Sequence, residues 1–351
     1  MDNSVDTEYK NNINERVQEL LNIPQYAQLS PEWFETRKTC ITASSAASLL
    51  IRDEKTCKKY VETYNLQDIF NYDKKCCNPY STKNQYYLDK CRGSKFKGNT
   101  ATYWGQKYEQ VASDIYSNIT GYTVLEFGLL KHKTIEFLGA SPDGVTENGI
   151  MLEIKCPYRR KIDGIPPLYY YIQCQLQMEC CDLDVCDFIE FEFVEFLTEQ
   201  EWLDKETISL DFKHQGLLIQ IEKINMNKDC IENEIGNPED NRYIYPPRNL
   251  INSIDDLLSW ANKELKKGRS GDNFESNTLK YSILYWKVSY FCNTRINRDK
   301  EWFAHVLPVF EKEWKLIKYY KKNNNHKKLT NESISHGKTI SMKDEKKYIP
   351  M

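Results

Sequence analysis

The chain has 351 residues, with 48 lysines and arginines against 51 aspartates and glutamates, and a formal net charge of −3. This length suffices for one enzyme core and a second domain or a large appendage. A nearly neutral charge excludes a general coat for nucleic acid, although basic residues can still gather in one groove. Because there is no signal peptide and no apolar run long enough to span a bilayer, we expect a soluble intracellular protein without a membrane partner.

The first predicted elements surround an arginine and a serine. Residues 1–30 are expected to form a leader with one short helix through Val17, Leu20 and Leu21. A second helix is predicted to begin near Ser44, where exposed backbone amides favour an anion. Arg37 adds a guanidinium that can hold phosphate oxygens in a fork. Taken singly, Arg37 is more typical of a surface salt bridge and Ser44 of a helix cap.

A long helix is predicted over residues 99–121, after an insertion over residues 51–98 that has no chemical signature of its own. Asn99 or Thr100 is the expected cap, and Gly121 the expected end. Glu109 borders the apolar face of this helix, so its carboxylate can look towards the sheet that follows. A solvated helix glutamate is the alternative interpretation.

Strands are predicted over residues 122–130 and 134–140, followed by a tight corner, SPDG, and another strand, LEIK. Glu153 and Lys155 are two residues apart and point to one face of that strand, and the corner can bring Asp143 beside them. Two carboxylates and an amine suit Mg²⁺, with Mn²⁺ as a substitute, and metal-assisted phosphodiester hydrolysis. Taken alone, the ExK pattern is more typical of an ordinary half-buried strand.

Basic residues flank these elements on both sides. Those after the LEIK strand are Arg159, Arg160 and Lys161. Those before the helix with Glu109 are Lys90, Arg92, Lys95 and Lys97. Contacts with a phosphate backbone and a merely solvated surface are equally good interpretations of both clusters.

The helix expected after Pro167 carries three alternating glutamines, Gln173, Gln175 and Gln177, which cannot all face one way. We expect one of the first two to face the metal site and Gln177 to lie on the surface. The strand over residues 187–196 then completes the core.

The rest of the chain is predicted to be mainly helical. One helix is expected over residues 253–267 and an aromatic-rich helical stretch over residues 278–320. The run rich in lysine and asparagine that follows predicts a flexible basic tail. The expected divisions are a leader (1–30), a core (31–205, with the insertion 51–98), a mostly helical region (206–320) and the tail (321–351).

The twelve cysteines predict reduced thiols and not a disulfide framework. One group lacks the CxxC spacing of a ligand set, which disfavours an iron–sulfur cluster. It comprises Cys174, Cys180, Cys181 and Cys186. A second group of cysteines could form a zinc site, although scattered free thiols are the favoured interpretation. That group comprises Cys57, Cys76, Cys77 and Cys91.

Four motifs follow one another along residues 31–196, about half of the chain. They are SPEWFETRKTCITASSAASLL, WGQKYEQVA, the pair GASPDGV and LEIKCP, and YYYIQCQLQM. In their residues and order they resemble the YqaJ type of viral recombinase, the lambda exonuclease branch of the PD-(D/E)xK nuclease superfamily.

The resemblance implies an α/β fold, a restriction-endonuclease-like core in which a central mixed sheet is flanked by helices, with the large insertion and a helical C-terminal appendage. It also implies a Mg²⁺-dependent 5′-to-3′ exonuclease. Such an enzyme degrades one strand of double-stranded DNA from an end and leaves a 3′ single-stranded tail. The tail would serve recombination or repair through a single-strand annealing partner.

The resemblance also assigns roles to residues. The metal ligands it implies are Glu109, Asp143, Glu153 and the carbonyl of Ile154. Lys155 would position or deprotonate the attacking water. Gln173 and Gln175 would lie beside the metal site. The 5′-terminal phosphate of the DNA would be held by the segment that contains Arg37, Thr42 and Ser44.

Two other functions remain compatible with the sequence. A structure-specific or site-specific DNA endonuclease can use the same fold, because a fold does not fix the mode of cutting. The motif around Arg37 disfavours this alternative, since a pocket for a terminal phosphate serves an enzyme that starts at ends. The second alternative is a catalytically silent DNA-binding protein, which the presence of Glu109, Asp143, Glu153 and Lys155 disfavours.

Overall fold

The computed structural model describes residues 13–51, 54–64, 66, 81–92, 98–204, 214–225, 234–235, 241–250, 253–270 and 279–323. Its centre is a large sheet with the strand order β10-β8-β11-β7-β6-β5-β2. Neighbouring strands are antiparallel except β6 and β7, which are parallel. The strands are β2 (Val124–Leu125), β5 (Gly144–Thr146), β6 (Ile150–Lys155), β7 (Val185–Phe196), β8 (Gln215–Asn225), β10 (Arg242–Ile244) and β11 (Leu279–Asn297). The expected mixed α/β class is confirmed.

Smaller pieces complete the sheets. The short strand β9 (Glu234–Ile235) pairs with β8. A separate sheet has the order β1-β4-β3, built from β1 (Ile41–Thr42), β3 (Leu130–Lys131) and β4 (Leu138–Ala140). The two strands predicted over 122–130 and 134–140 are therefore wrong in extent, because only short pieces of those segments find a partner strand.

Two helices cover the two faces of β6. Leu152 and Ile154 pack with Tyr108 of α7 (Thr100–Thr120) on one face. Met151 packs with Leu176 of α8 (Leu168–Cys181) on the other. This separation follows from the strand period, in which successive side chains alternate between faces. Glu153 and Lys155 consequently share the side of α8, at the end of the strand.

The ends of α7 agree with the prediction. The side chain of Asn99 accepts a hydrogen bond from the amide of Thr102 at 3.0 Å. Gly121 ends the helix with φ of 73°, a left-handed conformation that glycine adopts without strain.

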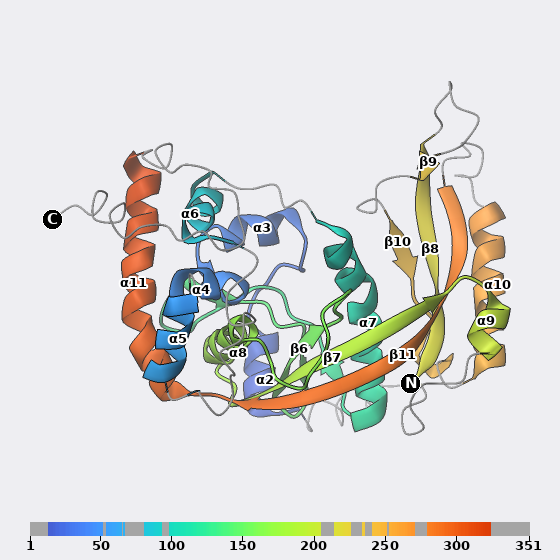
Figure 1. The fold of residues 1–351 in the computed structure, drawn as a ribbon, viewed down its shortest axis with the longest axis horizontal. Coiled ribbons are helices and arrows are strands. Elements are labelled where there is room, and N and C mark those ends of the chain that lie inside the picture. The colour runs from blue at the N-terminus through green and yellow to red at the C-terminus, as the bar shows by residue number, and fades with distance from the viewer. Residues whose placement is uncertain are drawn as a thin grey trace.

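A group of helices lies beyond α8, at one end of the molecule (Figure 1). The C-terminal helix α11 (Lys300–Asn323) packs there against α6 (Lys83–Arg92), and the buried Glu313 pairs with Lys83 and Tyr87. The helices α4 (Ala43–Leu50) and α5 (Glu54–Thr63) lie on this side as well, whereas α2 (Glu15–Leu21) and α3 (Pro31–Arg37) lie nearer the middle of the molecule (Figure 1). Part of the insertion 51–98 is thus joined to the C-terminal part of the chain.

The prediction of a mostly helical region over residues 206–320 is wrong. Residues 279–297 form β11, which pairs with both β7 and β8 and runs from α11 to the opposite end of the molecule (Figure 1). A second core lies there between β8, β11, α9 (Glu199–Asp204) and α10 (Ile254–Ser270), near the short helix η3 (Arg248–Leu250). Aromatic and β-branched residues in β11 favour a strand, but only its two distant partners decide this over a helix.

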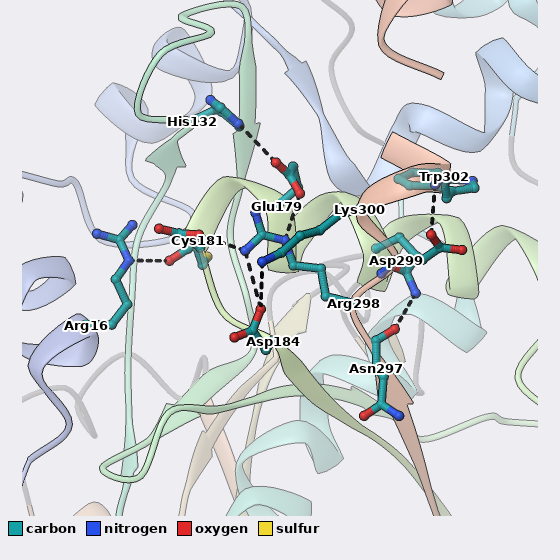
Figure 2. A network of polar contacts seen from close by, with 12 residues as sticks. Arg16, His132, Glu179, Cys181, Asp184, Asn297, Arg298, Asp299, Lys300 and Trp302 are labelled. Atoms are coloured by element: carbon teal, nitrogen blue, oxygen red, sulfur yellow. Dashed lines mark hydrogen bonds and ion pairs between the residues drawn. The ribbon is translucent and has the colours of Figure 1, made fainter. Parts of the chain in front are cut away.

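Polar contacts at the corner between β11 and α11 fix the position of α8, as Figure 2 shows. Arg298 donates hydrogen bonds to Glu179 at 2.8 Å and to Asp182 at 2.7 Å. Gln175 of α8 donates to the carbonyl of Asn297 and accepts from the amide of Asp299, both at 2.8 Å. The C-terminal part of the chain therefore sets the register of α8 against the sheet.

Some of the remaining predictions are confirmed, and others fall on residues that the structure does not describe. The helix through Val17 and Leu20 is confirmed as α2, and the helix expected over 253–267 is confirmed as α10. The cysteines of the described part carry free thiols. No described helix has the length and apolarity needed to cross a membrane. Residues 321–323 of the predicted tail belong to α11, whereas residues 324–351, Cys76, Cys77, Lys95 and Lys97 lie outside the described residues.

Candidate functional site

One cleft of about 390 Å³ contains most of the residues that the sequence singled out. Its polar lining includes Arg37, Ser44, Asp143, Glu153, Lys155 and Gln173. The cleft therefore joins the segment around Arg37 to the LEIK strand, although more than one hundred residues separate them in the sequence.

A hairpin brings Asp143 beside β6. Asp143 directly precedes β5, whose Gly144 pairs with Leu152. The amide of Ile154 donates a 2.7 Å hydrogen bond to Asp143 Oδ2. Since the amide and the carbonyl of one strand residue point to the same edge, the carbonyl of Ile154 also faces the side of Asp143.

Glu153 is fully buried, and side chains satisfy both of its carboxylate oxygens. Gln173 Nε2 donates to Oε1 and Gln177 Nε2 donates to Oε2, both at 2.7 Å. Lys155 forms an ion pair with Oε1. Gln173 and Gln177 are four residues apart and so share one face of α8. This pair fixes the orientation of the Glu153 carboxylate.

Lys155 lies between the two carboxylates, with Nζ 4.0 Å from Asp143 Oδ2 and 5.0 Å from the ring centre of Tyr170. Burial disfavours the ammonium form, but Glu153 and Asp143 outweigh it and raise the pKa of Lys155 well above its usual value. Lys155 is therefore a cation at neutral pH.

The carboxylates repel one another as well. Burial, followed by the charges of Glu153 and Glu109, raises the pKa of Asp143 well above its usual value. The pKa of Glu109 is also raised, first by the protein atoms that surround its carboxyl group and then by the charge of Glu153, although the residue as a whole is exposed. Carboxylates that lie this close together are stabilised by a bound cation.

The donor set fits a hard divalent cation such as Mg²⁺, because Asp143 and Glu153 offer carboxylate oxygens and Ile154 offers a carbonyl on the same side. Glu109 is on an exposed position of α7 and is not among the residues that line the cleft, although its charge acts on Asp143. Within the described residues, no three acidic, histidine or cysteine side chains converge closely enough to hold an ion together.

Arg37 and Ser44 form a polar pair at the other side of the cleft. Arg37 Nη2 donates to Ser44 Oγ at 3.1 Å, and its guanidinium lies 4.3 Å from the ring centre of Trp33. Ser44 is at the first turn of α4, whose cap residue Thr42 makes no side-chain capping bond. Burial lowers the pKa of Arg37, since the cation is partly removed from water. Arginine, hydroxyl and helix start are the groups that favour a phosphate.

Lys90 binds the backbone of the segment that carries Arg37, and its ammonium points into the protein. Its Nζ donates to the carbonyls of Arg37 and Cys40, both at 2.7 Å. Burial lowers the pKa of Lys90 to about 8. The interpretation of Lys90 as a residue that tracks phosphates is therefore wrong, because the ammonium is used to fix the backbone that carries Arg37. Arg92 of the same cluster is exposed.

Two glutamine predictions are also corrected. Gln175 was expected beside the metal site, but its side chain points to Asn297 and Asp299 at the corner of β11 and α11. Gln177 was expected on the surface, but only 1 % of it is exposed and it binds Glu153. Both follow from the helical period, since Gln173 and Gln177 share a face that excludes Gln175.

The basic residues after β6 do not line the cleft. Arg160 forms an ion pair with the buried Glu190 of β7. Arg159 and Lys161 are exposed.

Sequence reasoning missed several residues of the site. Gln28 holds the corner before Asp143, donating to the carbonyl of Pro142 at 3.1 Å. Trp33 Nε1 donates to Ser141 Oγ at 3.0 Å, which connects the segment around Arg37 to the same corner. Trp33 stands in the family pattern of the first motif and Ser141 lies in the third, although neither was given a role, whereas nothing in the sequence around Gln28 points to the site.

Part of the chain is similar to known proteins. Residues 72–184 match the YqaJ-like viral recombinase domain, a span that includes the acidic residues, Lys155 and the glutamines but not Arg37 or Ser44. An uncharacterized protein of Acanthamoeba polyphaga mimivirus is 28% identical over 343 residues, which cover 88% of this chain. The chain spans 56% of the length of that relative.

Among solved structures, LHK-Exo in complex with dAMP is similar with a TM-score of 0.43 and 18% identity, over 85% of this chain and 97% of that one. The alkaline exonuclease LHK-Exo from Laribacter hongkongensis gives 0.41 and 18% over the same shares. A phage-related exonuclease from Haemophilus somnus 129PT gives 0.38 and 14%, over 82% and 95%.

Proposed function

We propose that this chain, of which residues 72–184 match the YqaJ-like viral recombinase domain, is a divalent-metal-dependent 5′-to-3′ exonuclease that acts on the ends of double-stranded DNA. One observation carries the proposal. The cleft that contains Asp143, Glu153 and Lys155 also contains the Arg37–Ser44 pair. The residues proposed to cleave the DNA and the pair proposed to hold its terminal phosphate thus line the same cleft.

The acidic residues would hold the ion that the reaction requires. Asp143 and Glu153 provide carboxylates and Ile154 a carbonyl, which suit Mg²⁺ or Mn²⁺. When bound, the ion supplies a Lewis acid that activates water and stabilises the charge of the transition state. Gln173 and Gln177 keep Glu153 oriented throughout, because each holds one of its oxygens.

Lys155 would position the attacking water. Its ammonium lies between the two carboxylates and can donate a hydrogen bond towards the reacting phosphate. It also adds positive charge where negative charge develops, which is the largest contribution to many such reactions.

Arg37 and Ser44 would determine where cutting begins. A guanidinium and a hydroxyl at the start of a helix bind a terminal phosphate more tightly than an internal one, since a terminal phosphate carries more charge and more free oxygens. Digestion from such an end removes one strand and leaves a 3′ tail, and a single-strand annealing protein is the partner that this product implies.

A linear duplex with 5′-phosphate should be degraded in the presence of Mg²⁺, whereas the same duplex without the phosphate is degraded more slowly and a closed circle stays intact. Gel analysis of the three substrates, with strand-specific labels, measures both rate and direction. Cutting of the closed circle would show a structure-specific or site-specific endonuclease instead. Binding without cleavage under Mg²⁺ and Mn²⁺ would indicate a silent DNA-binding protein.

The Gln177→Ala variant should lose most cleavage activity, because the buried Oε2 of Glu153 loses its donor at a cost of roughly 1–3 kcal/mol. Gln175→Ala is the matched control: Gln175 is equally buried on the same helix but binds Asn297 and Asp299. Thermal unfolding should show both variants destabilised, while the cleavage rate per folded molecule falls only for Gln177→Ala. Equal rates would mean that Gln177 has only a structural role.

A further inference from the structure

The loop of residues 156–161 crosses the end of the sheet directly after the strand that carries Lys155. It is anchored on both faces. Tyr158 packs on Trp104 of α7, with ring centres 5.2 Å apart. Arg160 pairs with Glu190 and lies 5.9 Å from the ring centre of Tyr170 of α8.

Both anchors are held by further contacts. Trp104 packs in turn on Tyr108, with ring centres 4.9 Å apart, and Glu190 is fully buried. A loop held in this way at two points keeps its exposed side chains in place before any ligand arrives, which lowers the entropic cost of binding.

The part between the anchors presents an aromatic ring and a cation to solvent. Tyr158 is 39% exposed, and the Arg159 guanidinium lies 5.1 Å from its ring centre. Arg159 and the nearby Lys161 are both exposed, and neither has a carboxylate partner among the residues that the structure describes. The patch is therefore positively charged as well as aromatic.

The patch also lies close to the proposed reaction. Tyr158 is three residues beyond Lys155, so the backbone places it within about 10 Å of that residue. One or two nucleotides of a single strand span such a distance.

We propose that Tyr158 and Arg159 form a stacking site for an unpaired base of DNA next to the cleft. This inference rests on the proposed function. Aromatic rings bind bases of any sequence by stacking, and arginine adds a cation–π contact and neutralises phosphate. The positive charge of Arg159 and Lys161, which no carboxylate of the described part of the chain pairs with, fits the negative charge of a nucleic acid strand.

Binding to two fluorescent duplexes tests the site, with the full-length chain in EDTA so that no DNA is cut. One duplex has a five-nucleotide thymine overhang, and the other has an overhang of abasic nucleotides with the same phosphates. We expect wild type to bind the thymine overhang roughly tenfold more tightly, given the usual worth of base–aromatic stacking. Tyr158→Leu should abolish this preference, and Tyr158→Phe should retain it.

The adjacent pair Lys318 and Tyr319 provides a matched control, since both are exposed on α11 at the far side of α8. The double variant Lys318→Ala and Tyr319→Leu should keep the preference, whereas Tyr158→Leu with Arg159→Ala should lose it. Equal affinity of wild type for the two overhangs would overturn the stacking site, as would a preserved preference in Tyr158→Leu. Cleavage of a blunt duplex by wild type under Mg²⁺ is scored separately, so that a failed nuclease and a failed stacking site are told apart.

Discussion

The Lys155→Ala variant is expected to lose cleavage activity at least about a thousandfold while it still binds DNA. The ammonium of Lys155 is the cation that lies against both Glu153 and Asp143 in the cleft. Its removal takes away the positive charge beside the reacting phosphate and the donor for the attacking water. In the proposed function other residues also contact the DNA, so the affinity for DNA should change little. Single-turnover cleavage and anisotropy in EDTA measure the two properties separately.

Asp143→Ala should have an equal effect on cleavage, because it removes one of the two carboxylates that line the cleft. Lys312→Ala serves as the control for Lys155→Ala, since Lys312 is exposed on α11 and its loss changes the net charge by the same amount. We expect Lys155→Ala to be folded, because Gln173 and Gln177 still bind Glu153. Circular dichroism checks this. A folded Lys155→Ala variant with near-normal cleavage would rule out the proposed role of this residue.

The Arg37→Ala variant should lose the preference for a 5′-phosphorylated end, by about 10-fold to 100-fold. A charge-assisted contact with phosphate contributes roughly 1.5–3 kcal/mol, and Arg37 is the cation of the cleft beside Ser44 and the start of α4. The measurement is the ratio of initial rates on duplexes with and without the phosphate. Arg37→Lys should restore only part of the ratio, because an ammonium cannot bind two oxygens in a fork.

Lys38→Ala is the matched control for Arg37. Lys38 is the next residue and carries the same charge, but it pairs with Glu35 at 2.5 Å and does not line the cleft. Its substitution should leave the ratio unchanged. An Arg37→Ala variant that keeps the full preference for phosphorylated ends would show that another group recognises the phosphate.

The sequence predicted the parts of the site that depend on local geometry. Glu153 and Lys155 share a face because they are two residues apart on a strand, and the SPDG corner places Asp143 opposite them. The helix with Glu109 begins and ends where its cap residues predict. Each of these features is decided within about twenty residues of chain.

Features that depend on distant partners were missed. Gln175 and Gln177 differ in role because of their partners. Gln175 forms hydrogen bonds at the corner of β11 and α11, whereas Gln177 donates to Glu153. In the sequence Lys90 is one of several basic residues before α7. Only the fold brings the carbonyls of Arg37 and Cys40 to its ammonium. The aromatic segment over 279–297 became a strand because β7 and β8 offer it hydrogen bonds on both edges.

The sequence by itself determined which residues can perform chemistry: two carboxylates and a lysine at strand spacing, and an arginine before the start of a helix. Only the tertiary structure decided that these two groups share one cleft, that Gln28, Trp33 and Ser141 connect them, and that Gln177 belongs to the site. The physical reason is the range of the interactions. Strand and helix periods act over a few residues, whereas the cleft is formed by segments that meet only when β6, α4 and α8 pack together.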